Sequence, residues 1–204
     1  MNSICIKSDF TDYYDILQDK NSILTYNRNL SECKQRGTAL KYVRSLGLKT
    51  IEVKPVNQYI SLDGSILVYT NPKLHNGEGK KIMTVDEAMQ SYSNCIASKF
   101  YDNVSNVVKF LQIGKRRFTL YFKKDSPYDL SHGKLVDIRE SLSEYNRLIG
   151  LPILSIDYIE INGEMVATDF NEVENLKNLG IDEFIRPEDI IKEIKDSLIV
   201  YNKV

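Results

Sequence analysis

The spacing of apolar residues changes repeatedly along the chain between the period of a helix and that of a strand. After a short N-terminal strand, four large apolar residues lie on one face of a predicted helix. These residues are Phe10, Tyr13, Tyr14 and Leu17. Residues 22–28 and 48–55 have the composition of strands, and the segment between them predicts a second helix over 37–47. Thr38 is expected to cap this helix and Gly47 to end it.

Three later segments combine two β-rich runs with a central turn, and each predicts a β-hairpin. They span residues 58–69, 107–124 and 153–170. Their turns are expected at Asp63-Gly64, Gly114-Lys115 and Asn162-Gly163. These pairs tolerate the positive φ angles of tight hairpin turns, which is why they point to hairpins rather than to longer connections.

Helical spacing returns in the segments between and after the hairpins. Residues 84–100 begin with Thr84 and Glu87, the pattern of a capping box, and then place apolar residues on one face. Further helices are predicted over 133–150, 171–180 and 187–201. The polar, turn-forming stretch at 71–81 is expected to be the longest loop.

The order of these elements predicts an α+β fold. Hairpins outnumber β-helix-β units, so the sheet should be antiparallel or mixed, with helices packed on it. No internal repeat or low-complexity linker divides the sequence. We therefore expect a single domain over residues 1–204, with a possible hinge in the loop 71–81.

The composition of the chain bears on its cellular location and on its partners, and says little about its activity. The chain carries 27 basic and 28 acidic side chains, so its net charge of -1 supplies no global attraction for nucleic acid or an anionic membrane. Its three cysteines lack the spacing of a disulfide framework or a zinc site. We find no signal peptide and no run of about 18 apolar residues. A cytoplasmic protein without membrane partners is expected.

The opening stretch IKSDFTDYYDI resembles the start of a family of uncharacterised proteins from bacteria and their phages. Members begin with an I-x-SDF-x-DYYD signature, which this chain matches from Ile6 to Asp15. The stretch VENLKNLGIDEF is similar to a second element of the family, with Ile181 in place of an aromatic residue. The resemblance implies a cytoplasmic, often phage-encoded protein, and it brings no established activity.

Three aspartates in this opening stretch suggest a binding site. Carboxylates of Asp9, Asp12 and Asp15, converging at a strand end, could hold Mg²⁺, which prefers oxygen ligands. Tyr13 and Tyr14 beside them could stack on a base or donate hydrogen bonds to a ligand. An ordinary structural explanation fits equally: the aspartates cap and stabilise the positive end of a helix while the aromatic rings fill the core.

A weaker candidate is the predicted second hairpin. Lys115, Arg116 and Arg117 place several cations beside aromatic residues, a combination suited to phosphate contact and base stacking. Solvated hairpin tips are commonly basic as well. His75 and His132 stand alone in loops, and neither belongs to a paired-histidine motif.

Three classes of function remain open from the sequence. The first is a non-enzymatic phage accessory protein that needs no cofactor and binds a host or phage protein or a nucleotide-like ligand. The second is a metal-dependent enzyme that processes a nucleotide or phosphoester at the Asp9, Asp12 and Asp15 cluster, with Mg²⁺ as cofactor. The third is a virion or assembly component.

Overall fold

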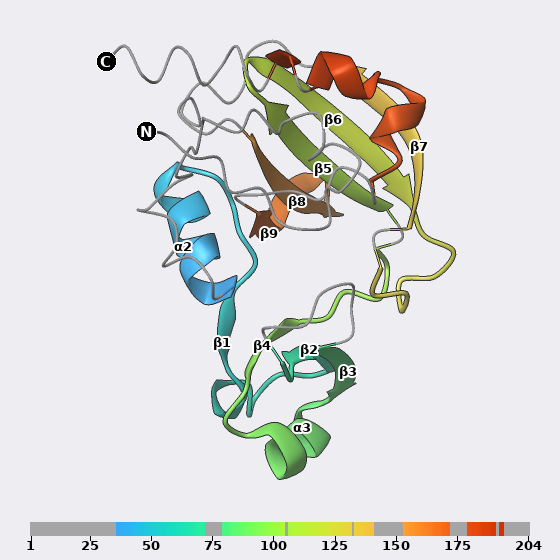
Figure 1. Cartoon of the computed structure of the whole chain (residues 1–204). Helices are drawn as coiled ribbons and strands as arrows, with labels where there is room; N and C mark the ends of the chain where they lie inside the picture. Colours follow the sequence, from blue (N-terminus) through green and yellow to red (C-terminus); the bar gives the residue numbers. More distant parts are fainter. Residues whose placement is uncertain are drawn as a thin grey trace.

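The computed structural model of the protein describes residues 36–71, 79–104, 106–131, 133–140, 153–171, 179–190 and 192–193. These residues form two antiparallel sheets, which lie at opposite ends of the view in Figure 1. The small sheet has the order β1 (Val53–Pro55), β4 (Ile96–Lys99), β2 (Ser65–Tyr69) and β3 (Lys80–Thr84). The large sheet has the order β7 (Lys134–Glu140), β6 (Arg116–Lys123), β5 (Asn106–Ile113), β8 (Ile153–Ile161) and β9 (Glu164–Asn171).

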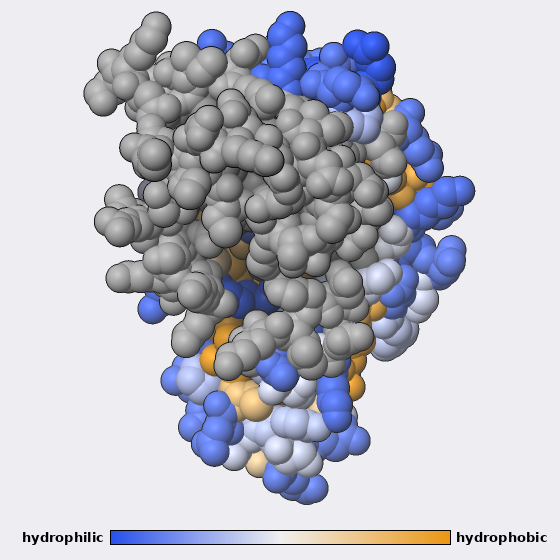
Figure 2. Space-filling model, viewed as in Figure 1, coloured by the Kyte–Doolittle hydropathy of each residue, from blue (hydrophilic) through white to orange (hydrophobic). Residues whose placement is uncertain are grey.

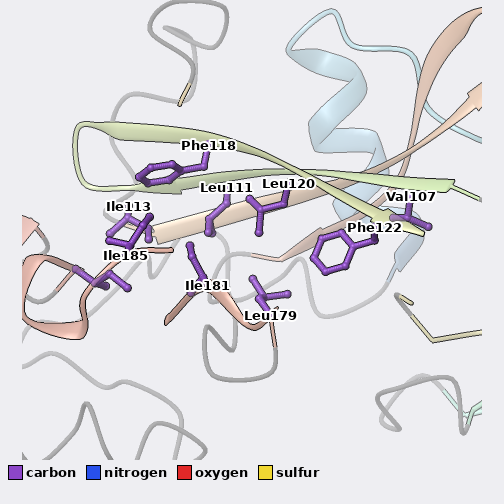
Figure 3. Close-up of a cluster of buried hydrophobic side chains, with 10 residues drawn as sticks. Val107, Leu111, Ile113, Phe118, Leu120, Phe122, Leu179, Ile181 and Ile185 are labelled. Atoms are coloured by element: carbon purple, nitrogen blue, oxygen red, sulfur yellow. The ribbon is translucent and has the colours of Figure 1, made fainter. Parts of the chain in front are cut away.

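One face of the large sheet is covered by the C-terminal part of the chain. Strands β5 and β6 alternate apolar side chains toward this face, as a half-buried strand requires. Figure 3 shows these side chains pointing at three residues that follow the large sheet in sequence. Those three are Leu179, Ile181 and Ile185, and the short 3-10 helix η6 (Ile181–Glu183) begins among them. Burying each such side chain contributes about 1.5–3 kcal/mol to folding.

The opposite face of the large sheet packs against helix α2 (Arg36–Ser45). Ala39 and Val43 of the helix are buried against apolar residues of β5, β8 and β9. The rings of Tyr42 and Phe170 lie 5.4 Å apart, centroid to centroid. Gly47, with a φ of 85°, lies just beyond the helix in the left-handed region that glycine adopts readily. α2 is therefore fixed beside β9, as Figure 1 shows.

The small sheet builds its core with helix α3 (Val85–Tyr92) and the short 3-10 helix η3 (Val56–Gln58). Ile66, Val68 and Ala97 of the sheet pack with Ala88 of α3. α3 begins in the expected capping box, in which the Thr84 hydroxyl accepts from a backbone N–H and a glutamate carboxylate accepts from Thr84.

Two segments carry the chain between the sheets. Residues 49–51 pair with β9 through a parallel bridge between Thr50 and Ala167 before the chain enters β1. After β4, residues 100–104 lead the chain back toward β5. Residues of both sheets and of these two segments line one shared pocket.

Several sequence-based predictions are confirmed. The hairpins at 107–124 and 153–170 exist as the pairs β5–β6 and β8–β9, with Gly114 and Asn162 at positive φ in their turns. Residues 187–190 and 192–193 are helical, as expected for a helix starting at Pro187. The α+β class agrees with the structure, although strands dominate and every ladder between named strands is antiparallel.

Four predictions are wrong. Residues 134–140 of the expected helix 133–150 form strand β7, because they pair with the free edge of β6. The expected hairpin 58–69 does not form, because β2 pairs with β3 and β4 instead. The helix expected over 84–100 ends at Tyr92, since residues 96–99 complete the small sheet as β4. Thr38 lies within α2, which begins at Arg36 rather than after a threonine cap.

Most of the expected hinge loop, at 72–78, lies outside the described residues, as do 141–150 and 172–178. The expectation of one domain stays a prediction. Along the part of the chain that the structure describes, no helix is long and apolar enough to cross a membrane.

Candidate functional site

A pocket lies between the two sheets, with walls from α2, both sheets and the segment after β6. One part of its wall is apolar and aromatic. This part contains Ile51, Leu67, Phe100, Tyr101, Val107 and Ile159. In Figure 2, apolar and strongly hydrophilic residues meet at the level of the chain where the two sheets approach each other. Such a mixture of apolar walls and a few polar groups is typical of small-molecule sites.

The other part of the pocket is rich in positive charge. Arg36, Lys80, Lys99 and Lys124 line it, against the single carboxylate of Asp157 among the described lining residues. Lys80 comes from the edge strand β3 and Lys124 from the segment just after β6. The two lysines and Arg36 lie close enough to influence each other's protonation. The pocket therefore presents an electropositive wall suited to an anion.

Lys80 and Lys124 have no carboxylate partner within the residues described. The Lys124 ammonium donates to the backbone carbonyl of Asp129 (2.7 Å), and the Lys80 ammonium has neither an ion pair nor a hydrogen bond with any described residue. Burial lowers the pKa of Lys80 below its ordinary 10.5, and the Arg36 guanidinium lowers it further, against the carboxylates of Asp169 and Asp157. Burial likewise lowers the pKa of Lys124. Two partly desolvated charges that form no ion pair with any described residue are costly to bury.

The segment after β6 is shaped by its own hydrogen bonds, and this explains why Lys124 is not neutralised by its neighbour. The Asp129 carboxylate accepts from the backbone N–H (2.8 Å) and the hydroxyl (2.9 Å) of Ser131. Gly133 has a φ of 81°, and a β-carbon there would collide with the Lys123 carbonyl. The carboxylate is thus committed to the turn, and only the Asp129 carbonyl is left for Lys124.

Oxygen ligands gather on strands β8 and β9 beside the cations. Lys109, Asp157 and Asp169 are direct neighbours across β5, β8 and β9, so their side chains form a row on one sheet face. Ser155 and Asn171 are paired in the next row. The Lys109 ammonium is fully buried and lies 2.6 Å from the Asp157 carboxylate. This row faces the same side as the apolar cluster in Figure 3.

Arg36 connects the two sheets at this point. Its guanidinium donates to the Thr168 carbonyl (2.6 Å) and to the Asp169 carboxylate (2.7 Å) on β9. The same group lies 4.7 Å from the ring centroid of Tyr69 on β2. Burial tends to lower the pKa of Arg36, but Asp169, Tyr69 and Asp157 raise it and the net change is upward. Arg36 is therefore a permanent cation at the boundary of the sheets.

Tyr69 forms the floor under this guanidinium. Its hydroxyl shares a hydrogen bond of 2.9 Å with the Ser98 hydroxyl on β4, and both residues are buried. Burial raises the pKa of Tyr69, although Arg36 opposes the shift. The phenol thus stays protonated and neutral at physiological pH.

A divalent cation fits this site only in part. Within the described ranges, no group of three or more His, Cys, Asp or Glu side chains is arranged to hold a metal ion. Asp157, Asp169 and the Asn171 amide do supply hard oxygen donors on adjacent strands. Mg²⁺ is commonly held by one or two carboxylates together with substrate phosphates. The donor set therefore suits Mg²⁺ accompanied by phosphate.

None of the residues singled out from the sequence is among the described residues that line this pocket. Asp9, Asp12, Tyr13, Tyr14 and Asp15 all lie outside the described residues, as do His75 and His132. Lys115, Arg116 and Arg117 lie at the β5–β6 turn and are not among the residues that line the pocket. There the Arg116 guanidinium pairs with Glu140 (3.2 Å), and the Lys115 backbone N–H donates to Glu193 (2.6 Å).

The polar residues on β5, β8 and β9 could have been recognised from the sequence, although the search for motifs missed them. Lys109 interrupts the apolar run VVKFLQI, and Ser155 and Asp157 interrupt ILSIDYI at alternate positions. A charged residue at an inward position of a predicted strand is unusual unless it is paired or functional. Asp169 and Asn171, at the end of the partner strand, continue the same alternation.

Comparison with known proteins identifies the fold. No family model and no curated protein matches the chain. The D-alanine-D-alanine ligase of Helicobacter pylori matches with a TM-score of 0.58 and 12% identity, over 93% of this chain and 68% of that chain. The Bacillus anthracis D-alanine-D-alanine ligase complexed with ATP gives 0.52 and 12%, over 84% and 67%.

A third neighbour is the ATP-grasp ligase PsnB, complexed with a phosphomimetic variant of its minimal precursor, Mg and ADP. It gives a TM-score of 0.58 and 10% identity, over 92% of this chain and 68% of that chain. The chain thus shares the fold of these ligases and spans about two thirds of their length.

This likeness corrects two expectations. We expected a non-catalytic phage accessory protein, with a metal-dependent phosphoester- or nucleotide-processing enzyme or a virion component as alternatives. The fold shared with ATP-dependent ligases contradicts this expectation. The absence of a cofactor is contradicted as well, because neighbours of this fold bind ATP, ADP and Mg. The expected nucleotide-like ligand agrees with these neighbours, whereas a host or phage protein partner finds no support in them. The N-terminal family resemblance is not tested by these comparisons.

Proposed function

We propose that the protein is an ATP-dependent ligase that binds the nucleotide with Mg²⁺ in the pocket between the two sheets. The observation that carries this proposal is the pair of half-buried ammonium groups, Lys80 and Lys124, which have no carboxylate partner among the described residues and face one pocket with Arg36. A bound polyphosphate would supply the missing negative charge. Charge-assisted hydrogen bonds from lysine and arginine are the usual means of holding phosphate in proteins.

The rest of the pocket suits the other parts of a nucleotide. Ile51, Leu67 and Ile159 offer flat apolar surface for a base, and Tyr101 lies beside them. Asp157 and Asp169, with the Asn171 amide, are the residues that would hold Mg²⁺, and the ion would neutralise part of the charge of the phosphates. The fold likeness to ligases supports the reaction class. A cytoplasmic location stays a prediction from the sequence.

Nucleotide binding is tested by calorimetric titration of Mg–ADP into the wild type and two variants. Lys80→Met removes the ammonium from the pocket wall, and we expect its affinity for Mg–ADP to fall at least about tenfold, or about 1.4 kcal/mol. Lys81→Met is the matched control, because Lys81 is the next residue of β3 and is exposed, with its ammonium on the Tyr92 hydroxyl. This control should bind like the wild type.

The proposal fails if the wild type does not bind Mg–ADP, or if Lys80→Met and Lys81→Met bind it equally. Ligase turnover is measured separately, as release of ADP from ATP that requires both an added carboxylic acid and an added amine. Release without either substrate would instead indicate simple hydrolysis of ATP.

A further inference from the structure

Each of the two carboxylates in the row on β8 and β9, Asp157 and Asp169, already carries a positive partner from the chain itself. The Lys109 ammonium lies 2.6 Å from Asp157, and the Arg36 guanidinium lies 2.7 Å from Asp169. Both cations are held firmly: Lys109 is fully buried, and the Arg36 side chain is only 16% exposed. These are internal ion pairs rather than solvent-screened surface contacts, so their charges cancel strongly.

These ion pairs reduce the negative charge that the Asp157 and Asp169 carboxylates can offer to a metal ion in the absence of nucleotide. Two carboxylates with two adjacent cations have no net charge, and Lys80 and Lys124 add positive charge to the same pocket. Mg²⁺ gives up its water reluctantly and needs negative oxygen ligands to compensate. The described residues hold no third carboxylate near this pair, so the charges that they contribute around the site sum to neutral or positive.

We propose that Lys109 and Arg36 act as built-in counter-ions that withhold Asp157 and Asp169 from free divalent cations. The metal then binds only together with nucleotide phosphates, which supply the negative charge that the paired carboxylates lack. Lys109 and Arg36 are positioning residues in this scheme, because they act through the carboxylates. The proposal rests on the proposed nucleotide-binding function and adds to it the order in which metal and nucleotide bind.

Both contacts also fix the carboxylates in place. Lys109 reaches the Ser155 hydroxyl (3.5 Å) as well as Asp157, which anchors the ammonium between two residues of β8. Arg36 is anchored on the Thr168 carbonyl as well as on Asp169. Neither cation can leave its carboxylate without losing a second contact, so weak attraction from a hydrated metal ion is insufficient to displace it.

The test uses Mn²⁺ as the probe and electron paramagnetic resonance as the readout, because the signal of hydrated Mn²⁺ weakens when the ion binds protein. The full-length wild type, Lys109→Met, Arg36→Met and the control Lys81→Met are titrated at pH 7.5 without nucleotide, and again with ADP. Circular dichroism establishes that each variant is folded.

Without nucleotide, the wild type and Lys81→Met should bind Mn²⁺ only weakly. Lys109→Met and Arg36→Met should each bind it at least about tenfold more tightly, because one carboxylate has lost its counter-ion. ADP should increase the Mn²⁺ affinity of the wild type by at least about tenfold, and by a smaller factor in the two variants.

Equal Mn²⁺ binding by the wild type with and without ADP would overturn the proposal, as would folded variants that gain no Mn²⁺ affinity. If Lys109→Met does not fold without metal, recovery of its cooperative melting by Mn²⁺ supports the proposal, and no recovery together with no gain in Arg36→Met overturns it. A wild type that fails to bind ADP would refute the proposed function, while the nucleotide-free titrations would still decide whether the counter-ions exclude metal.

Discussion

Two halves of one sheet face differ sharply in character. Where β5 and β6 meet the C-terminal segment, the face is formed by Leu111, Leu120 and their apolar neighbours. Across β8 and β9, the same rows of the ladder continue with Asp157 and Asp169. Lys109 stands at the boundary, with Leu120 on one side and Asp157 on the other.

This difference indicates that the two halves of the sheet face contribute differently to stability and to ligand binding. The apolar half stabilises the fold by removing large side chains from water, and its contribution is largely insensitive to ligands. The charged half carries buried ion pairs, Lys109 with Asp157 and Arg36 with Asp169, in which each charge depends on its partner. We therefore expect substitutions in the first half to change stability with little effect on ligand affinity, and substitutions in the second half to change both.

The largest effect on stability is expected from Ile181→Ala in the apolar half. Ile181 is fully buried, and truncation should cost about 3–4 kcal/mol, from lost transfer free energy and the cavity left behind. Denaturant unfolding measures the loss, and Mg–ADP affinity of the folded protein should be unchanged. Ile60→Ala is the control, since Ile60 is 72% exposed and its loss should cost less than about 0.5 kcal/mol.

Asp157→Asn should have the next largest effect and should change both properties. It leaves the buried Lys109 ammonium facing a neutral amide, at a cost of about 2–3 kcal/mol in the free energy of unfolding. It also removes a proposed metal ligand, so Mg–ADP should bind more weakly. Adding Lys109→Met should restore much of the stability but not the ligand affinity; a double variant no more stable than Asp157→Asn would refute this coupling.

Lys80→Met should raise the stability of the free protein and lower its affinity for nucleotide. Replacing a half-buried ammonium by an apolar side chain of similar length should stabilise the free protein by about 1 kcal/mol while it weakens nucleotide binding. Thermal melting with and without Mg–ADP measures both. A free variant that melts below the wild type would show that the ammonium is already well compensated.

The same substitution has a pH signature. Burial lowers the pKa of Lys80 from its ordinary 10.5, so in the alkaline window below 10.5 the unfolded chain binds more protons than the folded one. Wild-type stability from this group therefore rises with pH through that window. The advantage of Lys80→Met over the wild type should be largest near neutrality and should shrink toward pH 10.5, as measured by unfolding at several pH values.

Arg116→Ala, outside both halves of the face, should have the smallest effect. Its ion pair with Glu140 is exposed, and such pairs contribute about 0.5 kcal/mol or less. The loss should vanish in high salt, because solvent ions screen exposed charges. Mg–ADP affinity should equal that of the wild type; a clear loss would place the β5–β6 turn near the ligand.

The fold could be predicted where the determining signals are local. The hairpins β5–β6 and β8–β9 each combine alternating apolar residues with a turn that their own sequence specifies. The small sheet could not be predicted, because β2 pairs with β3 and β4 across distant positions and not with its near neighbour. Residues 134–140 likewise became a strand through pairing with β6, which overrides their helical spacing.

The site was less predictable than the fold. Lys80 and Arg36 have no unusual sequence neighbours. They come together only in the folded pocket, which residues from many separate segments line. Asp157 and Lys109 could have been noticed as charges within apolar strands, but their pairing depends on the register of β5 against β8. The acidic N-terminal cluster of Asp9, Asp12 and Asp15 lies outside the described residues and stays a prediction.

The bridge between Thr50 and Ala167 also bears on how the protein avoids self-association. An open strand edge offers unpaired amides to other chains, and residues 49–51 occupy part of that edge on β9. At the opposite edge, β7 carries the charged residues Lys134, Asp137, Arg139 and Glu140. Charged side chains protect the β7 edge, and backbone pairing with residues 49–51 protects the β9 edge. Deleting residues 49–51 would therefore expose an edge strand to which other chains could pair and aggregate.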